Sequence, residues 1–308
     1  MVEGNIEKHA QLIGENITSE HIRRQEEARV KAFEEFGAAE QHRATQRFQA
    51  LKTTVRPQLY ANKQDFLKRQ ICPGTSEWLG KDTTFLDWVD IGSQTTRSLW
   101  LQGIPGAGKT LLASWVVSRA KAAGRAIYAF LSHTHADNTT ISIIHSFLFQ
   151  LASEDASIQA MLADANKREF VSDTAVAKVL LADAIGYAGN TFLVVDGLDE
   201  IAESERGDFL SLMMEILDSH PGLRFCISSR AEDDIRKILD SKAAVIRIDT
   251  KNSPGIYTYV QSRFKRWMRE ASFTHEGSDE IRALLSPICV KAKGAHFSLF
   301  HSHVRSGN

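Results

Sequence analysis

Residues Gly103 to Thr110 read Gly-Ile-Pro-Gly-Ala-Gly-Lys-Thr, which is a complete phosphate-binding loop of the form G-x-x-x-x-G-K-[ST]. The apolar run at 98–101 before it indicates a buried strand, and residues 111–117 after it have helical spacing and no breaker. The pattern has physical meaning when it joins a strand to a helix in this way. The stretch therefore predicts a P-loop at a strand-to-helix turn.

The chemistry of such a loop is the binding of phosphate oxygens. Its glycines let backbone N–H groups turn inward, and the positive end of the following helix favours an anion. Lys109 can reach the β- and γ-phosphates, and the Thr110 hydroxyl can bind Mg²⁺. The nucleotide-binding residues that we expect are Gly103, Ile104, Pro105, Gly106, Ala107, Gly108, Lys109, Thr110 and Leu111. The alternative is a glycine-rich turn that binds nothing, and the flanking strand and helix argue against it.

The composition is typical of a folded protein without a strong net charge. The 308 residues leave room for one large domain or two smaller ones, and 43% hydrophobic content is enough for a packed core. A net charge of −1 argues against nucleic acid or an anionic membrane as a partner. The three cysteines form no C-x-x-C pair, which fits a reducing compartment. The sequence shows no signal peptide and no apolar run near the ~18 residues of a membrane span, so we expect a cytoplasmic protein.

Residues 1–70 are charged, poor in Gly and Pro, and rich in Glu, Gln, Ala and Arg. We expect one or two long amphipathic helices here, which end near Pro57. Their sparse apolar residues are Val30 and Phe33, followed by a narrow stripe of Phe48, Leu51 and Val55. The stripe can pair with another helix in a coiled coil or pack on the next domain. A solvated helical leader is an equally good interpretation, because the heptads are not sustained.

Strands and helices alternate after Pro73-Gly74-Thr75. Apolar runs predict strands at 98–102, 126–132, 191–195, 224–228 and 244–248. Helical segments are expected at about 110–123, 140–152, 174–186, 206–218 and 231–240, and residues 253–293 are helical in character throughout. This alternation predicts βαβ units and an α/β, three-layer P-loop NTPase sandwich with a mostly parallel five-stranded sheet. We expect a helical leader at 1–70, a nucleotide-binding domain at 71–250 and a short, incomplete helical extension at 251–308.

A second set of candidate site residues follows the apolar run at 191–195. Asp196 ends this strand, and a carboxylate at such a position holds Mg²⁺ opposite the P-loop hydroxyl in P-loop proteins. Asp199 and Glu200 follow closely enough for one of them to orient or deprotonate an attacking water. Three acids alone would fit a surface turn equally well. The P-loop favours a joint catalytic and metal site.

Arg230 ends another apolar run, 224–229, and is a candidate catalytic residue. A cation at a neighbouring strand end can sense or stabilise the γ-phosphate. Ligands lie at the carboxyl ends of strands in open α/β sheets, which favours this role. The alternative is a solvated arginine or one paired with a carboxylate, since arginine pairs are common.

Together these blocks resemble the NACHT branch of the STAND nucleotide-switch ATPases, as found in fungal NOD-like proteins. The resemblance covers about residues 70–294. Its motifs are the P-loop, the acidic block 194–200 as a NACHT form of Walker B, and the Ser228-Ser229-Arg230 strand end as a sensor arginine. A fourth block is the lead-in before the P-loop, with Cys72 to Thr75, Trp78, Leu79, Phe85, Trp88, Leu99 and Trp100.

The resemblance implies a regulated switch that uses ATP or ADP with Mg²⁺ and hydrolyses slowly. In the family, ADP holds a closed state, and exchange for ATP permits self-association, which presents an amino-terminal effector. Fungal members act in non-self recognition, heterokaryon incompatibility and cell death. The family would continue after residue 294 with an apolar run, a winged helix and sensing repeats. This chain ends at Asn308 instead, so we expect a truncated product or an imperfect gene model.

Several functions compete with an ATP switch, and GTP is an alternative nucleotide. A nucleotide-binding adaptor would keep its ligand as a structural element and associate through its helices. A small-molecule kinase would need a basic lid and an acceptor site, to which no sequence feature points. A non-functional fragment would show no nucleotide-stabilised melt. His133 and His135, which follow an expected strand, are taken as surface histidines or histidines with satisfied hydrogen bonds. His296, His301 and His303 are taken as a polar tail rather than a metal cluster.

Overall fold

The computed structural model describes residues 29–31, 34–35, 37–133 and 138–271. Phe33, His135 and the three histidines of the tail lie outside the described residues, as does the proposed departure from the family after residue 294. Contacts divide the chain into two compact units. One consists of residues 1–54 with 159–165, and the other of residues 55–158 with 166–308. Each unit is described by itself.

The larger unit is built on a five-stranded sheet in which every neighbouring pair is parallel. Its strands are β1 (Ser98–Gln102), β2 (Arg125–Phe130), β3 (Thr191–Asp196), β4 (Leu223–Ser229) and β5 (Ala244–Arg247). Their order is β2-β3-β4-β1-β5. All residues of β3 and β4 are buried, as expected for strands covered on both faces. The predicted parallel five-stranded sheet is confirmed.

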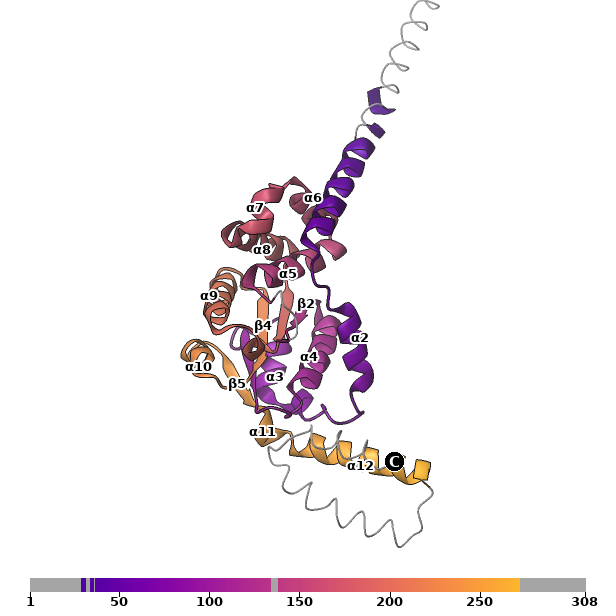
Figure 1. The fold of residues 1–308 in the computed structure, drawn as a ribbon, viewed down its shortest axis with the longest axis vertical. Helices are drawn as coiled ribbons and strands as arrows, with labels where there is room; N and C mark the ends of the chain where they lie inside the picture. The colour runs from indigo at the N-terminus through magenta and orange to yellow at the C-terminus, as the bar shows by residue number, and fades with distance from the viewer. Residues whose placement is uncertain (1–28, 32–33, 36, 134–137, 272–308) are drawn as a thin grey trace, which may run out of the picture. The chain divides into compact units, whose positions relative to one another are not determined.

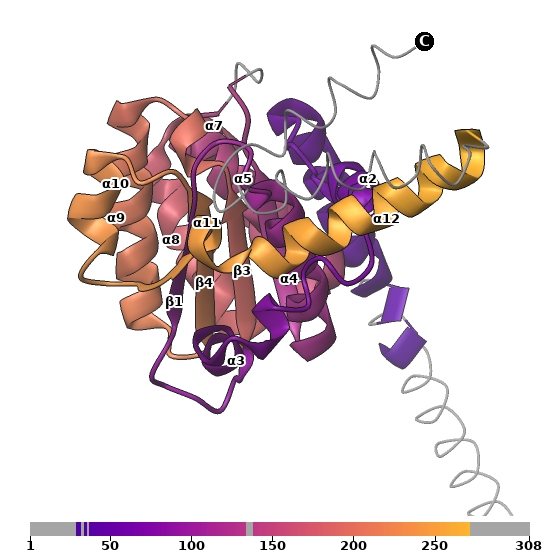
Figure 2. The ribbon, with the colours of Figure 1, turned by 90° about the horizontal axis from the view of Figure 1, so that it is seen from below.

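Helices cover both faces of this sheet, as the predicted three-layer fold requires. Seen from below, α9 and α10 lie on one side of β1, β3 and β4, and α4 and α2 lie on the other (Figure 2). The helices are α2 (Ala61–Gln70), α3 (Thr83–Val89), α4 (Lys109–Ala123), α5 (Thr140–Glu154), α6 (Ala156–Asp164), α7 (Lys167–Ser172), α8 (Thr174–Ala188), α9 (Glu203–Ser219), α10 (Asp233–Leu239), α11 (Ile248–Lys251) and α12 (Ser253–Ala271), as labelled in Figure 1. Short 3₁₀ turns, η1 (Leu79–Lys81) and η2 (Leu198–Glu200), complete the fold.

Local sequence explains where several helices begin. The Asp82 side chain accepts hydrogen bonds from the N–H groups of Thr84 and Phe85 at the start of α3. Asp173 caps α8 in the same way, and Thr139 forms a capping box with Ser142 at α5. A capping side chain of this kind stabilises a helix by about 1 kcal/mol, because it pairs an N–H that has no partner within the helix.

The segment before the P-loop packs against the P-loop's own strand and helix. The Gln64 side chain of α2 is buried and donates to the Ser114 carbonyl of α4 at 2.9 Å. Trp88 of α3 is fully buried, and its Nε1 donates to the Phe225 carbonyl of β4 at 3.2 Å. Phe85, Trp88 and Trp100 of the lead-in therefore belong to the core on which the P-loop rests.

The smaller unit contains a helix at residues 37–54 and the segment 159–165. Arg47 and Asp164 join the two through an ion pair of 3.2 Å. Phe48 and Leu51 of the predicted stripe are each 3% exposed, whereas Val30 is 52% exposed. The centre of the stripe is thus covered within a single chain. Across the described parts of both units, no helix is long and apolar enough to cross a membrane.

Candidate nucleotide-binding site

The candidate site lies where three neighbouring parallel strands end. In the sheet, Gln102 of β1 pairs with Ser229 of β4, and Asp196 of β3 pairs with Ser228 of β4. The P-loop follows β1, the acidic turn follows β3, and Arg230 follows β4. Because parallel strands end at one edge, residues far apart in sequence are brought together there.

The P-loop backbone adopts a conformation that depends on glycine. Gly106 and Gly108 have φ values of 77° and 90°, in the left-handed region that other residues rarely adopt. At Gly103, a Cβ would lie 3.3 Å from the Cβ atoms of Ala107 and Ile248, so a larger residue would disturb close packing. The Gly103 N–H donates to the Ser229 carbonyl at 3.2 Å, which ties the start of the loop to β4.

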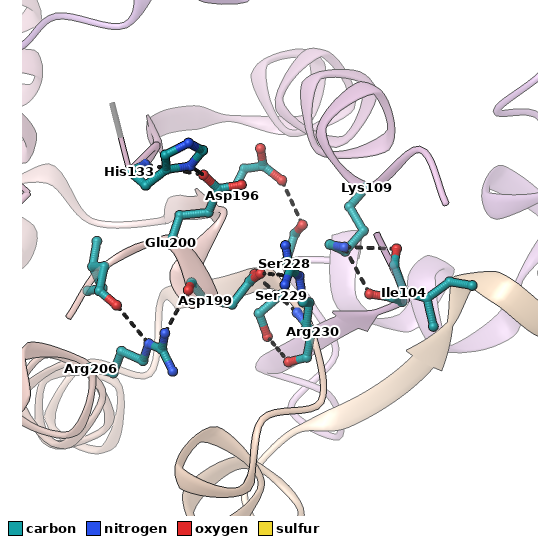
Figure 3. A network of polar contacts seen from close by, with 12 residues as sticks. Ile104, Lys109, His133, Asp196, Asp199, Glu200, Arg206, Ser228, Ser229 and Arg230 are labelled. Carbon is teal, nitrogen blue, oxygen red and sulfur yellow. Dashed lines mark hydrogen bonds and ion pairs between the residues drawn. The ribbon is translucent and has the colours of Figure 1, made fainter. Parts of the chain in front are cut away.

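Lys109, the first residue of α4, is folded back over its own loop. Its Nζ donates to the carbonyl oxygens of Gly103 at 2.8 Å and Ile104 at 3.1 Å (Figure 3). Burial lowers the pKa of Lys109, while the negative charges of Asp199 and Asp196 oppose this effect. The ammonium group is therefore held at the loop, close to the acids of the neighbouring strand.

Asp196 is a buried carboxyl group at the end of β3. Its Oδ1 accepts a hydrogen bond of 2.6 Å from the Ser228 hydroxyl, and its side chain is also hydrogen-bonded to Thr110. Burial raises the pKa of Asp196 to about 6, although both hydrogen bonds and the Lys109 charge lower it. The hydroxyl group of Thr110 thus lies close enough to the Asp196 carboxyl group to lower its pKa, so the two predicted metal ligands are neighbours.

Asp199 is paired with Arg230. The Arg230 Nε lies 3.0 Å from Asp199 Oδ2, and the Arg230 backbone N–H donates to Asp199 Oδ1 at 3.1 Å. The Asp199 side chain is 4% exposed, so these contacts satisfy a carboxylate that has little access to water. Of the interpretations offered for Arg230, the structure shows the arginine that is paired with a carboxylate.

Arg206 of α9 braces the turn that carries Asp199. Its Nη2 donates to the Asp199 carbonyl at 2.6 Å, and its Nε donates to the Ile201 carbonyl at 2.9 Å. Its Nη1 also lies 3.2 Å from a carboxylate oxygen of Asp234. One mostly buried guanidinium group therefore fixes the turn between β3 and α9, a role that no sequence motif indicated.

Glu200 is contacted by a histidine that follows β2. The His133 Nδ1 lies 2.7 Å from Glu200 Oε2, and the His133 backbone N–H donates to the same oxygen at 3.2 Å (Figure 3). Burial alone would raise the pKa of Glu200, but these bonds outweigh it and keep the pKa below its usual value. Glu200 is therefore held in its ionised form with one oxygen fixed by His133.

The donor set suits magnesium bound together with phosphate. Among the described residues, no three His, Cys, Asp or Glu side chains gather into a metal site. Mg²⁺ takes oxygen ligands, commonly one or two carboxylates, and completes its shell with water and substrate phosphates. The Thr110 hydroxyl and the Asp196 carboxylate supply two adjacent oxygen donors. A cation there would also offset the burial that disfavours the ionised form of Asp196.

The structure brings the residues chosen from sequence to one sheet edge. Lys109, Asp199, Asp196, Arg230 and Glu200 interact electrostatically. His133, set aside as a surface histidine or one with satisfied hydrogen bonds, joins them at Glu200. In the structure β2 and β3 pair in parallel with Phe130 opposite Asp196, a strand order that the sequence alone does not show. Residues just beyond both strand ends should therefore lie side by side.

Comparison with known proteins agrees with the presence of a P-loop nucleotide-binding fold. A family model described as Nephrocystin 3, N-terminal, matches residues 74–230, just over half of the chain. The vegetative incompatibility protein HET-E-1 of Podospora anserina is 24% identical over 215 residues. That match covers 66% of this chain but 15% of the relative, so the chain spans a small part of that protein.

Two solved structures show more distant similarity. The Aeropyrum pernix Orc1 protein in complex with DNA is 14% identical with a TM-score of 0.44, over 64% of this chain and 50% of that one. The Walker-type ATPase of Pyrococcus abyssi is also 14% identical with a TM-score of 0.44, over 77% and 68%. The match to the family model and to HET-E-1 confirms the resemblance to NACHT-type P-loop NTPases. This chain is a P-loop NTPase-like protein and belongs to the Nephrocystin 3, N-terminal family.

Proposed function

We propose that this protein binds ATP or ADP with Mg²⁺ and hydrolyses ATP slowly, as a STAND-type signalling switch. The observation that carries the proposal is the placement of the Thr110 hydroxyl next to the Asp196 carboxylate beside a complete P-loop, with Glu200 at the same sheet edge. This combination supplies a phosphate cradle, a pair of magnesium ligands and a carboxylate for water. GTP remains the alternative nucleotide.

In this proposal each residue has one role. The loop from Gly103 to Leu111 cradles the phosphates, and Lys109 leaves its two carbonyl partners to bind them. Bound Mg²⁺, held by Thr110 and Asp196, would neutralise charge on the phosphate oxygens.

The two remaining acids differ in their surroundings. Asp199 is nearly buried and is engaged by Arg230, so it acts by positioning that arginine, which in turn stabilises charge on the γ-phosphate. Glu200 has a 32% exposed side chain and a lowered pKa, so it is ionised and accessible to water. Glu200 is therefore the better candidate to orient or deprotonate the attacking water.

The signalling role rests on relationship rather than on geometry. The relative HET-E-1 is described as a vegetative incompatibility protein, and this supports a role in fungal non-self recognition or cell-death signalling. We propose that residues 71–250 form the nucleotide-binding domain and that self-association occurs through this domain or the helices of residues 1–70. Residues 251–308 would be a helical extension. The net charge of −1 gives no support to a nucleic-acid partner.

The second candidate is an adaptor whose bound nucleotide is structural. Two contacts within the protein favour the adaptor. Lys109 is bonded to the Gly103 carbonyl and Arg230 to Asp199, so both cations already have partners in this state. The two functions differ at Glu200. A switch needs this carboxylate for turnover, whereas an adaptor needs only the cradle.

The test is a thermal melt with Mg²⁺ and ATP, ADP or GTP, combined with a turnover assay. A ligand that binds only the folded state stabilises it and therefore raises Tm. The added stability is about 2.7 kcal/mol when the free ligand concentration is a hundred times Kd. We expect this rise in the wild type and in Glu200→Gln, and its loss in Lys109→Ala. Turnover should fall about a hundredfold or more in Glu200→Gln. Stabilisation without measurable turnover in either the wild type or Glu200→Gln would favour the adaptor, and no stabilisation by any nucleotide would exclude both.

A further inference from the structure

Asn252, between α11 and α12, forms a hydrogen bond with the P-loop. Its Nδ2 donates to the Ala107 carbonyl at 3.1 Å, and the residue is 5% exposed. Its backbone N–H donates to the Ile248 carbonyl at 2.8 Å, and its own carbonyl accepts from Ile256 at 2.9 Å. The side chain that reaches the P-loop therefore extends from a backbone fixed on both sides.

This bond determines how one peptide group of the P-loop is turned. A trans peptide is planar, and its C=O and N–H groups point in opposite directions. The structure contains no cis peptide among its described residues. Fixing the Ala107 carbonyl toward Asn252 thus directs the Gly108 N–H to the opposite side. Gly108 has a left-handed φ of 90°, and glycine can adopt many other backbone conformations as well. A contact such as the one from Asn252 is therefore needed to hold this peptide in one orientation.

The position of Asn252 depends on close packing against the segment before the P-loop. A Cβ added to Gly255 of α12 would collide with the Thr75 carbonyl oxygen and with Asn252 Oδ1. Lys251 forms an ion pair of 2.5 Å with Asp82, which lies in the same lead-in. The start of α12 (Figure 1) is therefore held by the lead-in while Asn252 reaches the loop.

Asn252 also carries a polar atom that has no partner. Its Oδ1 is buried and lacks a hydrogen bond to any other described residue. Leaving such an acceptor unpaired costs about 1–3 kcal/mol, and an apolar residue would avoid this cost. An asparagine at this position also suits the start of a helix, but its Nδ2 makes the side-chain contact that reaches the P-loop from here.

We propose that Asn252 is a positioning residue for nucleotide binding, which holds the Ala107–Gly108 peptide of the P-loop with its N–H turned toward the phosphates. The inference rests on the proposed nucleotide binding at this loop, and it adds that affinity depends on where α12 begins. Any displacement of α12 from the lead-in would remove this bond and weaken the cradle.

The test uses Asn252→Ser in the full chain, because serine tolerates a helix start but is too short to reach Ala107. Lys251→Ala is the matched control, since it removes the ion pair between the start of α12 and Asp82, which does not touch the P-loop. We expect Asn252→Ser to raise the Kd for ADP and ATP about five- to tenfold, the factor expected from one lost hydrogen bond. Lys251→Ala should leave Kd within about twofold of the wild type.

A second measurement separates this inference from the proposed function. Hydrogen exchange of a peptide covering residues 103–112, in protein without nucleotide, should be faster in Asn252→Ser and unchanged in Lys251→Ala. If the wild type binds no nucleotide, the proposed function fails, and hydrogen exchange alone decides the role of Asn252. Unchanged exchange and Kd in a folded Asn252→Ser protein would overturn the inference. Equal effects in both variants would overturn it too, because they would show only that the start of α12 had loosened from the lead-in.

Discussion

Asp196 is the residue at which binding chemistry and stability conflict most clearly. Burial raises its pKa to about 6 in the folded protein, from an ordinary value near 4. The folded state therefore binds this proton more tightly than the unfolded state, so the contribution of Asp196 to stability falls as pH rises between about 4 and 6. Above pH 6 the full penalty applies, on the order of 3 kcal/mol.

We therefore predict that Asp196→Asn stabilises the protein without nucleotide or Mg²⁺, and does so more at pH 8 than at pH 4.5. Asparagine can still accept from Ser228 but carries no charge to bury. Urea unfolding in EDTA at both pH values measures the difference. Asp183→Asn, an exposed change on α8, serves as the control and should alter stability by less than about 0.5 kcal/mol. A gain that is the same at pH 4.5 and pH 8 would contradict the assignment of a buried ionised carboxylate.

Single residues were predictable where one motif fixes both the residue and its neighbours. The P-loop pattern placed Lys109 and Thr110, and the apolar run before Asp196 placed that acid at a strand end. His133 and Asn252 were not predictable in this way, because each contact joins segments that are distant in sequence. His133 reaches Glu200 across 67 positions and Asn252 reaches Ala107 across 145. Only the strand order and the packing of α12 bring these pairs together.

At the level of elements, the turn after β3 depends on a glycine. Gly197 has a φ of 79°, and a Cβ there would lie 2.9 Å from the Leu131 carbonyl oxygen. Because that oxygen belongs to the backbone, it cannot rotate away, and the turn carrying Asp199 and Glu200 would have to shift. We predict that Gly197→Ala destabilises the protein by about 1–3 kcal/mol and also weakens turnover.

Gly207 in α9 provides the matched control for this prediction. It lies inside a helix, and a Cβ there would meet nothing within 4 Å. Gly207→Ala should stabilise the protein by about 0.5–1 kcal/mol, because alanine favours the helix. Urea unfolding of both variants makes the comparison. Two alanine variants with the same sign of effect would show that backbone conformation does not govern the β3 turn.

Sequence periodicity identified those elements whose environment is uniform. β3 and β4 are fully buried, so their apolar runs were unambiguous, and the expected strands agree with the structure to within about two residues. The short helices α6 and α7 were not predicted, because they divide a region of mixed polarity into brief turns. The docking of α2 was also missed, since it depends on the buried polar contact of Gln64 with α4.

At the scale of the whole molecule, the question is whether the apolar stripe of the amino-terminal helix binds a partner or stabilises its own chain. An adaptor that associates through this stripe needs Phe48 and Leu51 to be free for a partner. Both are 3% exposed within one chain, so they already contribute to its stability. Burying a phenylalanine stabilises a protein by about 3–5 kcal/mol relative to alanine, which leaves little reason for the side chain to change partners.

We predict that Phe48→Ala lowers the free energy of unfolding by about 3 kcal/mol or more and leaves the oligomeric state in the absence of nucleotide unchanged. Urea unfolding and sedimentation velocity at several protein concentrations measure the two properties. Val30→Ala, in the helical residues 29–31 and 52% exposed, should change neither. If Phe48→Ala instead dissociated an oligomer without loss of stability, the stripe would be an intermolecular surface, and association through the amino-terminal helices would gain direct support. The predicted outcome would remove this stripe from the surfaces through which a switch of this type could assemble.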